Sequence, residues 1–316
     1  ALDLMEKSGL AVKKPNQRQY QATIPSLPGL EVLFQRVGDI ALSVRDGIVD
    51  FGITGLDVVS EMQDDEKNIV VMLNHLGFGH CKLCAIVPES AEGIESVQDV
   101  LGLVKTKNDP LRVATKFPKL TKRFFDTHGL FNVNYIVSEG ALEIAPLIGY
   151  ADMITDLVSS GLTLRDNRLK VLNDGVIIES QACLIANRHN LKTVPEIMDV
   201  ARQLLEFIVA YLRAENNVAV FANIRGDSAE EVAGLILQKE VIRGLQGPTI
   251  SRVITHQGEK WFAIHLIIKK MDLAKGISEL RSIGGSGVVV TPVSFIFEEE
   301  PAAYTRLLSV LEADNG

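Results

Sequence analysis

The stretch from Asp156 to Thr163 has the residue types, in the order, that can hold a sugar phosphate. An apolar segment ends there in two hydroxyls, a glycine and, two residues later, a third hydroxyl. Gly161 lets the backbone take a positive φ or approach a ligand closely. Asp156 can accept hydrogen bonds from sugar hydroxyls or bind a magnesium ion. The stretch suits a ribose 5-phosphate, with backbone N–H groups turned toward the phosphate. An ordinary strand-to-helix loop with a hydroxyl cap is an equally good interpretation. The side-chain donors of the turn are Ser159, Ser160 and Thr163.

The whole chain has the composition of a globular protein of about two domains. It has 316 residues, 47% of them hydrophobic, which is enough for a large core. Its formal net charge of −8 argues against a nucleic-acid partner, because nucleic acids are usually bound by a basic face. Three cysteines are too few for a disulfide framework and fit a reducing compartment.

The first ten residues are typical of the second half of an amphipathic helix that Gly9 closes. We therefore expect residues before Ala1, and with them room for a targeting segment. No apolar run approaches the roughly 18 residues of a membrane helix. The expected location is the cytoplasm or, if a transit peptide has been removed, the plastid stroma.

Other strand-to-helix turns are predicted before the sugar-phosphate stretch. Residues 48–53 are predicted to form a buried strand that delivers a glycine-rich turn and Asp57 to the start of a helix. Residues 111–115 are a second strand, followed by Lys116 and a helix from about residue 119. Ligands bind at such strand ends in parallel α/β units. A tight turn capped by Asp57 is the plain alternative for the first of them.

Cations crowd the start of the helix that follows residue 118. They oppose the helix dipole, an arrangement that makes sense if an anion lies between them. A solvated basic face is the alternative interpretation. The cations are Lys116, Lys119, Lys122 and Arg123.

Only one stretch has spacing that resembles a metal site: His75, His80, Cys81 and Cys84. Cys81 and Cys84 are expected on opposite faces of one strand. Two ligands that point to opposite faces cannot share an ion, so the pattern favours an ordinary strand.

The pattern changes at residue 217. From there to residue 297 the order strand, helix, strand, strand, helix, strand is predicted. This is the split arrangement of ferredoxin-like folds. We expect a small independent domain that begins near residue 216.

Taken together, these motifs resemble ATP phosphoribosyltransferase of the long form, the first enzyme of histidine biosynthesis. The resemblance covers nearly the whole chain in order. The stretch after Asp156 is similar to the phosphoribosyl-diphosphate loop of phosphoribosyltransferases, although those often have two adjacent acids where this chain has one. The family begins with a strand and a Lys-Gly-Arg turn that would lie before Ala1. The segments that carry the resemblance are residues 52–57, 113–121, 139–146, 156–163, 244–251 and 283–292.

The family resemblance implies an α/β fold with two lobes, like a type II periplasmic binding protein, with the active site in the cleft. It also implies an α+β, ferredoxin-like (ACT-like) regulatory domain at the C-terminal end. The expected ranges are 1–87 with 181–215 for lobe I, 88–180 for lobe II and 216–316 for the regulatory domain. A homohexamer, a magnesium requirement, feedback inhibition by L-histidine and no membrane partner are further implications.

The implied reaction joins N1 of the adenine of ATP to C1 of phosphoribosyl diphosphate, inverts that carbon and expels diphosphate. Such a reaction needs little proton transfer, so positioning and electrostatic stabilisation should carry it. Magnesium would arrive with the diphosphate, with Glu143 as a candidate ligand. Catalytic roles are expected of Asp156, Glu139 and Glu143. Binding of phosphoribosyl diphosphate is expected of Gly140, Ala141, Ser159, Ser160, Gly161, Leu162 and Thr163. ATP is expected at Arg36, Asp57 and Lys116, and L-histidine near Asn223, Leu245 and Ser286.

Two other classes of protein share parts of this pattern. A two-lobed solute receptor would have the lobes and the strand-end anion sites, but it would need export and would not explain the tail. The ligand-sensing module of a transcription regulator would share both kinds of domain, but no helix-turn-helix or basic arm is evident in the sequence. Diphosphate release that depends on ATP distinguishes the enzyme from both.

Overall fold

The structure, a computed structural model, describes residues 1–16, 18–62, 68–106, 109–138, 140, 142–255 and 259–313. The chain divides into two compact units. The two-lobed unit contains residues 15–22, 32–201 and 306–316, and the tail unit contains residues 1–14, 23–31 and 202–305. No helix within the described ranges is both long enough and apolar enough to cross a membrane.

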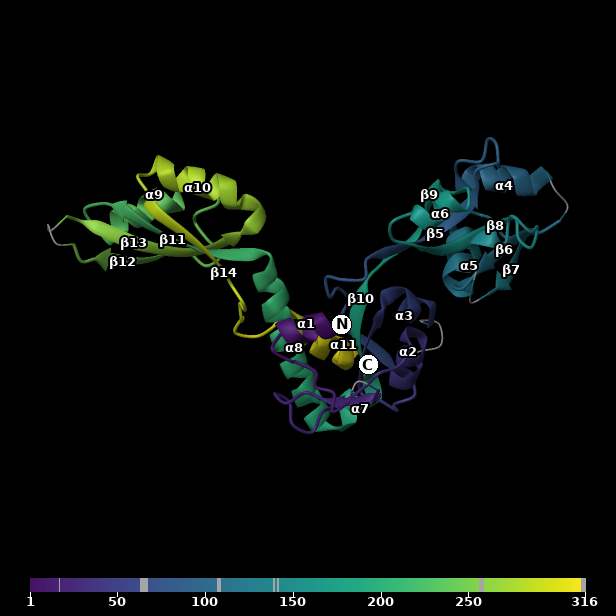
Figure 1. Cartoon of the computed structure of the whole chain (residues 1–316), viewed down its shortest axis with the longest axis horizontal. Helices are drawn as coiled ribbons and strands as arrows, with labels where there is room; N and C mark the ends of the chain where they lie inside the picture. Colours follow the sequence, from purple (N-terminus) through teal and green to yellow (C-terminus); the bar gives the residue numbers. More distant parts are fainter. Residues whose placement is uncertain are drawn as a thin grey trace. The chain divides into compact units, whose positions relative to one another are not determined.

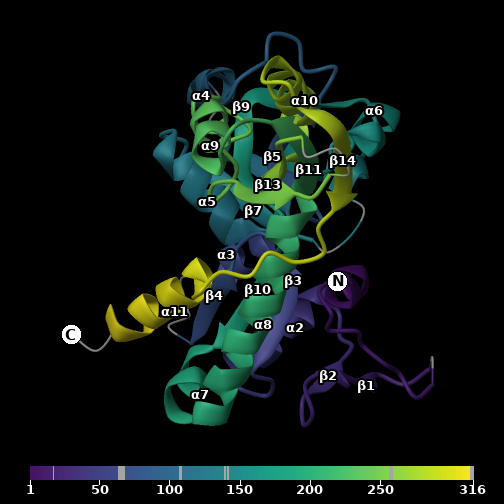
Figure 2. The same cartoon turned by 90° about the vertical axis from the view of Figure 1, so that its left-hand side faces the viewer.

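Lobe I of the two-lobed unit is a three-stranded sheet with helices beside it, as Figure 2 shows for α2 and α3. The strand order is β3-β10-β4, and β10 is antiparallel to both neighbours. Gly52 permits α2 to pack directly on β3, because an added Cβ would lie 2.6 Å from Cγ2 of Ile40. The elements are α2 (Val37–Arg45), β3 (Phe51–Gly55), α3 (Leu56–Met62), β4 (Ile69–Leu73), β10 (Ala182–Asn187) and α7 (Arg188–Thr193). Two short strands, β1 (Gln21–Thr23) and β2 (Glu31–Leu33), precede them in the chain.

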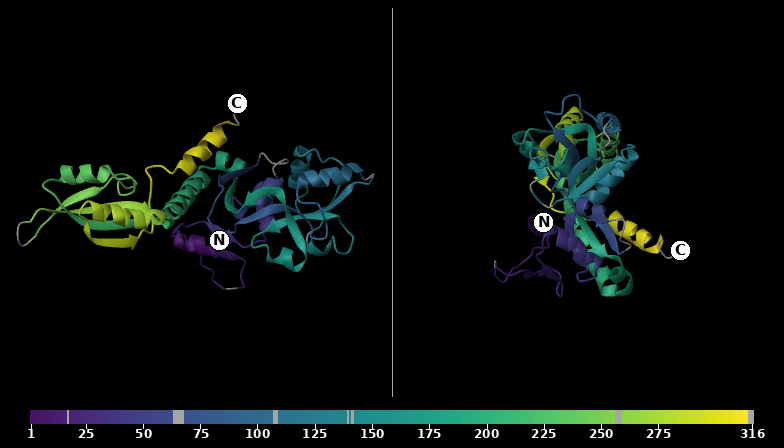
Figure 3. Two further views of the ribbon diagram at one scale, coloured as in Figure 1. Left: turned by 90° about the horizontal axis from the view of Figure 1, so that it is seen from above. Right: turned by 90° about the vertical axis from the view of Figure 1, so that its right-hand side faces the viewer.

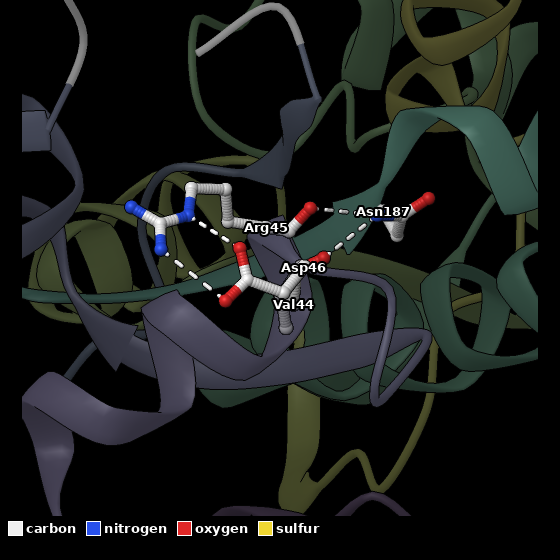
Figure 4. Close-up of polar contacts among 4 residues, drawn as sticks. All are labelled: Val44, Arg45, Asp46 and Asn187. Carbon is white, nitrogen blue, oxygen red and sulfur yellow. Dashed lines mark hydrogen bonds and ion pairs between the residues drawn. The ribbon is translucent and has the colours of Figure 1, made fainter. Parts of the chain in front are cut away.

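Asn187 links the end of α2 to the start of α7, and Figure 4 shows its hydrogen bonds to Val44 and Arg45. Its side-chain oxygen accepts from the amide of Asn190 at 2.9 Å and so caps α7. Its side-chain nitrogen donates to the carbonyls of Val44 at 2.7 Å and Arg45 at 3.2 Å, at the end of α2. One buried amide therefore satisfies orphan groups at the C-terminus of one helix and the N-terminus of another. Arg45 also pairs with Asp46, with 2.6 Å between Nε and Oδ1.

Lobe II is a five-stranded sheet in the order β7-β6-β8-β5-β9. β6 is parallel to β7 and β8, and β5 is antiparallel to β8 and β9. The predicted range of lobe I runs to residue 87, but β5 pairs with two strands of this second sheet, so the chain crosses over before Cys81. The elements are β5 (Cys81–Pro88), α4 (Val97–Thr106), β6 (Leu111–Thr115), α5 (Pro118–Thr127), β7 (Val133–Val137), the 3₁₀ turn η2 (Leu142–Ile144), β8 (Met153–Val158), α6 (Leu162–Asp166) and β9 (Leu169–Ser180).

Both faces of the lobe II sheet are covered, which is why its strands are apolar on both sides. Val113 and Met153 pack on one face with Phe125 of α5. Ala114 and Ile154, the next residues of the same strands, pack on the other face in the cluster that includes Leu142 of η2 and Leu164 of α6. Successive residues of a strand point to opposite faces, so the two sets of contacts fix the orientation of every residue up to the strand ends.

The tail unit contains the ferredoxin-like arrangement predicted from the sequence. Its four strands lie in the order β12-β13-β11-β14, all antiparallel to their neighbours. Both helices cover one face of the sheet (Figure 1), and the view from above shows them over the strands (Figure 3). The fold class is thereby confirmed. The elements are β11 (Asn217–Arg225), α9 (Ala229–Leu237), β12 (Thr249–Val253), β13 (Trp261–Lys269), η3 (Lys270–Asp272), α10 (Leu273–Ser282) and β14 (Ser286–Pro292).

Three helices of the described residues, α1, α8 and α11, lie outside the sheets and their covering helices. In α8 the buried positions Ala201, Leu204, Leu205 and Ile208 follow the spacing predicted for one helix face. The bounds of these helices are Leu2–Lys7 for α1, Pro195–Glu215 for α8 and Ala302–Ala313 for α11.

Candidate active site

The candidate site lies at the carboxyl edge of two parallel strands in lobe II. Thr115 at the end of β6 is the register partner of Thr155 in β8. Lys116 and Asp156 follow these threonines in the chain, so both emerge at one edge of the sheet. Strand ends of this kind are where open α/β sheets bind ligands.

Asp156 lies half-buried among charges of both signs. Its Oδ1 accepts from the amide of Leu157 at 2.7 Å. Burial raises the pKa of Asp156 and the negative charge of Glu143 adds to the rise, while the Leu157 amide and the positive charge of Lys116 oppose it. The structure therefore places Glu143 and Lys116 close enough to Asp156 for their charges to act on its carboxylate.

The turn after β8 has the backbone that the sequence predicted. Gly161 has φ +71° and precedes α6 in the left-handed conformation. A Cβ at Gly161 would meet nothing within 4 Å, so the requirement for glycine comes from the backbone angle and not from crowding. The three hydroxyl-bearing residues and Leu162 are exposed. The turn thus presents open N–H and O–H donors next to Asp156.

The segment between β7 and η2 was predicted to line the sugar and diphosphate. Glu139 and Ala141 lie outside the described residues. Gly140 is exposed, and its carbonyl accepts from Oγ of Ser138 at 3.2 Å. Glu143 lies in η2, whose Leu142 packs into the core beneath it. The short turn therefore anchors Glu143 to the same sheet face as Asp156.

Among the described residues, no three or more His, Cys, Asp or Glu side chains are grouped to hold a metal ion. All three cysteines are free thiols. Burial raises the pKa of Cys84 to about 11 and that of Cys183 to about 12, so both favour the thiol over the thiolate that metals bind.

An anion does lie at the start of α5, as the cluster of cations suggested, and it is the carboxylate of Glu61. The amide of Lys119 donates to its Oε1 at 2.7 Å and the amide of Leu120 donates to its Oε2 at 2.9 Å. Burial raises the pKa of Glu61, and the two amides with the charges of Lys119 and Arg123 oppose the rise. Glu61 belongs to α3, so a helix of lobe I supplies the counter-charge for a helix of lobe II.

Asp57 lies at the start of the same helix α3 and is only 5% exposed. Oγ of Ser180 donates to its Oδ1 at 2.6 Å and accepts from its backbone amide at 2.9 Å. Ser180 is the last residue of β9, one residue before the chain passes to β10. The structure thus places Asp57 at a crossover between the lobes, while Arg36, the N-cap residue of α2, is exposed.

Two of the three residues predicted to bind L-histidine are neighbours in the tail unit. Asn223 of β11 and Ser286 of β14 are register partners across a β-bulge. The amide of Leu245 bonds to the carbonyl of Ile267 at 3.1 Å. Asn223 pairs with Ala263 of β13, and Ile267 lies four residues further along that strand, about 13 Å away. Leu245 is therefore bonded to β13 at some distance from Asn223 and Ser286.

The sequence interpretation missed the residues that position the charged groups. Ser180 and Glu61 have no motif, and their partners are 123 and about 58 residues away. Three buried threonines behind the site, at positions 115, 121 and 155, also form a hydrogen-bonded set. Thr115 lies at the end of a predicted strand, but Thr155 lies within a strand and Thr121 within a helix, so the sequence had no signal for the set as a whole.

The arrangement and the sequence match known proteins. The family model described as ATP phosphoribosyltransferase matches residues 36–208, and the model of the C-terminal domain of that family matches residues 214–295. The chain is 41% identical to ATP phosphoribosyltransferase 2, chloroplastic, of Arabidopsis thaliana over 98% of this chain and 77% of the relative. It is 35% identical to the ATP phosphoribosyltransferase of Methanocaldococcus jannaschii over 93% and 94% of the two chains.

Among solved structures, the ATP phosphoribosyl transferase (HisG:HisZ) complex from Thermotoga maritima has a similar fold. The TM-score is 0.50 at 22% identity, over 66% of this chain and 91% of that chain. The resemblance carried by the motifs is thereby confirmed in sequence and in fold, and the chain belongs to the ATP phosphoribosyltransferase family.

Proposed function

We propose that this family member joins N1 of the adenine of ATP to C1 of phosphoribosyl diphosphate and releases diphosphate, the first step of L-histidine biosynthesis. The observation that carries the proposal is the left-handed turn at Gly161, which lies five residues after Asp156 at the end of the same strand and has exposed hydroxyl-bearing residues around it. A sugar needs an acceptor for its hydroxyls and a set of donors for its phosphate. The strand end at Asp156 supplies both within eight residues of chain.

The residues of this edge divide into groups by what they would touch. The 5-phosphate would lie at the turn, and Asp156 would accept from the ribose hydroxyls. ATP would approach from the side of Lys116, and Arg36 would contribute positive charge. Asp57 would act indirectly, through its hydrogen bonds to Ser180 at the crossover between the lobes. Those assigned to the turn are Ser159, Ser160, Gly161, Leu162 and Thr163, and those on the ribose and diphosphate side are Glu139, Gly140, Ala141 and Glu143.

The donor set fits a magnesium ion held together with diphosphate. Glu143 raises the pKa of Asp156 through its negative charge, so a divalent cation near both would relieve a repulsion between them. Mg²⁺ prefers one or two carboxylates together with phosphate oxygens. When bound, it would neutralise charge on the leaving diphosphate. Asp156 and Glu143 are the residues we propose to hold it.

The chain's own groups would act by position and charge. The transition state at C1 has oxocarbenium character, and negative charge grows on the departing diphosphate. A fixed cation such as Lys116 stabilises that charge without a proton transfer. The turn at Gly161 and the carboxylate of Asp156 hold the ribose so that the adenine nitrogen meets C1 on the face opposite the leaving group.

The test is diphosphate release in the presence of magnesium, measured with each substrate alone and with both. Release that requires both ATP and phosphoribosyl diphosphate supports the proposal, and release without ATP contradicts it. Thr163→Ala should raise the KM for phosphoribosyl diphosphate about 10-fold, because one hydrogen bond to a charged group is lost. The KM for ATP should stay close to wild type. Thr193→Ala, an exposed threonine that bonds within its own helix, is the matched control.

We further propose that L-histidine inhibits the enzyme by binding between ferredoxin-like domains of a homohexamer, near Asn223, Leu245 and Ser286. The neighbouring amide and hydroxyl of Asn223 and Ser286 offer the donors and acceptors that an amino acid needs. Asn223→Ala should raise the histidine concentration that halves the activity, with Arg252→Ala on the edge strand as control. Equal histidine sensitivity in both variants would contradict the assignment.

Two relatives are named chloroplastic, which supports the plastid stroma over the cytoplasm as the location.

A further inference from the structure

Three threonine hydroxyls behind the site form a closed ring of hydrogen bonds. Thr115 ends β6, Thr121 lies in α5 and Thr155 lies in β8. All three residues are 0% exposed. The oxygens are separated by 2.6 Å between Thr155 and Thr115, 2.7 Å between Thr121 and Thr155, and 3.2 Å between Thr115 and Thr121. The ring therefore joins two parallel strands and one helix at a single buried point.

One arrangement of the protons satisfies all three hydroxyls of the ring. Thr155 donates to Thr115, and each hydroxyl has one proton, so Thr115 donates to Thr121 and Thr121 donates to Thr155. The amide of Phe117 adds a second donor to the Thr115 oxygen at 2.9 Å. Each hydroxyl donates once and accepts at least once, so the set is satisfied without water. Fully satisfied buried networks rigidify what they connect.

The ring lies directly behind the charged groups of the site. Thr115 and Thr155 precede Lys116 and Asp156 in the chain and are register partners. Thr155 points to the face that α5 covers, because Met153 of the same strand packs there. Asp156 points to the other face, where η2 carries Glu143. A shift of β8 against β6 would move Asp156 relative to Lys116, and the ring opposes that shift.

We infer that the ring of Thr115, Thr121 and Thr155 is a positioning device that holds Asp156 in register with Lys116 for the reaction. The inference rests on the proposed function, since it assigns the ring to the site that would bind phosphoribosyl diphosphate. None of the three hydroxyls is exposed, so they act through their neighbours and do not touch the substrate. This role differs from simple support of the core, and kinetics can separate the two.

The test replaces the hydroxyl while keeping the shape. Thr155→Val removes the ring's hydroxyl with nearly the same volume, and Thr155→Ser keeps the hydroxyl and loses a methyl. A misplacement of about 1 Å can cost about 100-fold in rate. We expect Thr155→Val to lower kcat/KM for phosphoribosyl diphosphate by about 10-fold to 100-fold, and Thr155→Ser to stay within about 3-fold of wild type. Thr121→Val breaks the same ring from the helix side and should repeat the kinetic pattern.

A matched core variant separates positioning from stability. Val100→Ala removes packing from α4, in the same core but away from the site edge. It should lower the unfolding temperature and leave both KM values unchanged. The inference is overturned if Val100→Ala impairs kcat/KM as much as Thr155→Val at equal loss of stability. It is also overturned if the serine variant fails as badly as the valine variant. Wild-type activity in the same assay tests the proposed function separately, so an active wild type with an unimpaired Thr155→Val counts against the ring alone.

Discussion

Replacing Ser180 with alanine should weaken the two-lobed unit although Ser180 would touch no substrate. Its hydroxyl makes two buried hydrogen bonds to Asp57, one to the carboxylate at 2.6 Å and one from the backbone amide at 2.9 Å. Ser180 is 4% exposed and Asp57 is 5% exposed, so water does not replace the lost partner. A hydrogen bond to a charged group contributes about 1.5–3 kcal/mol. A lost cap at the start of a helix costs about 1 kcal/mol.

The two contributions predict a loss of roughly 3 kcal/mol in the free energy of unfolding for Ser180→Ala. For a unit of this size, each kcal/mol corresponds to about 2–4 °C in Tm, so the transition should fall by roughly 10 °C. Far-UV circular dichroism during heating is the measurement. Thr127→Ala, an exposed residue that bonds within the end of its own helix, is the control and should change stability by less than about 0.5 kcal/mol.

The hydrogen bonds between Ser180 and Asp57 also allow a test of the proposed part of Asp57 in ATP binding. If Asp57 acts through the crossover, Ser180→Ala and Asp57→Asn should raise the KM for ATP by similar factors, because both loosen the same bond. The double variant should then be no worse than the more damaging single variant, as expected for two residues in one interaction. The reasoning is refuted if Asp57→Asn raises the KM for ATP more than about 10-fold while Ser180→Ala keeps the wild-type KM and stability.

Three further outcomes follow from the site. Burial and Glu143 raise the pKa of Asp156. As the pH is lowered, the carboxylate is therefore protonated, and activity that needs it lost, at a higher pH than for an ordinary aspartate. In pH profiles of kcat/KM, Glu143→Gln should move this acid limb to lower pH and Lys116→Met should move it to higher pH; shifts in the same direction would contradict the charge arrangement. Because the folded-state pKa of Glu61 is raised, its contribution to stability is full below the unfolded pKa and is lost as pH rises through the folded value. Denaturant unfolding should show wild type losing stability relative to Glu61→Gln as the pH rises from below the ordinary Glu pKa toward neutral pH, and a difference independent of pH would count against it. Gly161→Ala should cost about 1 kcal/mol for the left-handed backbone, measured by denaturant unfolding, with a rise in the KM for phosphoribosyl diphosphate; an unchanged KM would show that the turn does not bind it.

The sequence predicted those features that depend on neighbours along the chain. The turn at Gly161 needed a positive φ, and glycine after a strand is a local signal for it. The tail's order of strands and helices followed from hydrophobic periodicity and fixed its topology. The cations around Lys116 indicated a nearby anion through the helix dipole, which is also a local effect.

Partners that are distant in the chain could not be predicted in the same way. An anion near Lys119 was expected, but the chain contains 40 acidic residues, and nothing local distinguishes Glu61 from the others. The same holds for the ring, in which Thr155 and Thr115 are 40 residues apart. A buried polar group bonds to whichever partner lies near it in three dimensions. The strand β5 was expected in lobe I, but it pairs with β8 of lobe II. The crossover between the lobes therefore lies earlier in the chain than predicted, and different groups meet as a result.

Helix α3 connects the two lobes through two of its carboxylates. Asp57 and Glu61 are four residues apart, so they lie on one face of the helix. Asp57 bonds to Ser180 of β9, and Glu61 bonds to the first amides of α5. The two contacts differ in burial, because Asp57 is enclosed while Glu61 is half-exposed. Water can therefore reach the Glu61 contact, while the Asp57 contact is closed to it, so the hydrogen bonds of Asp57 are the ones whose loss solvent cannot compensate.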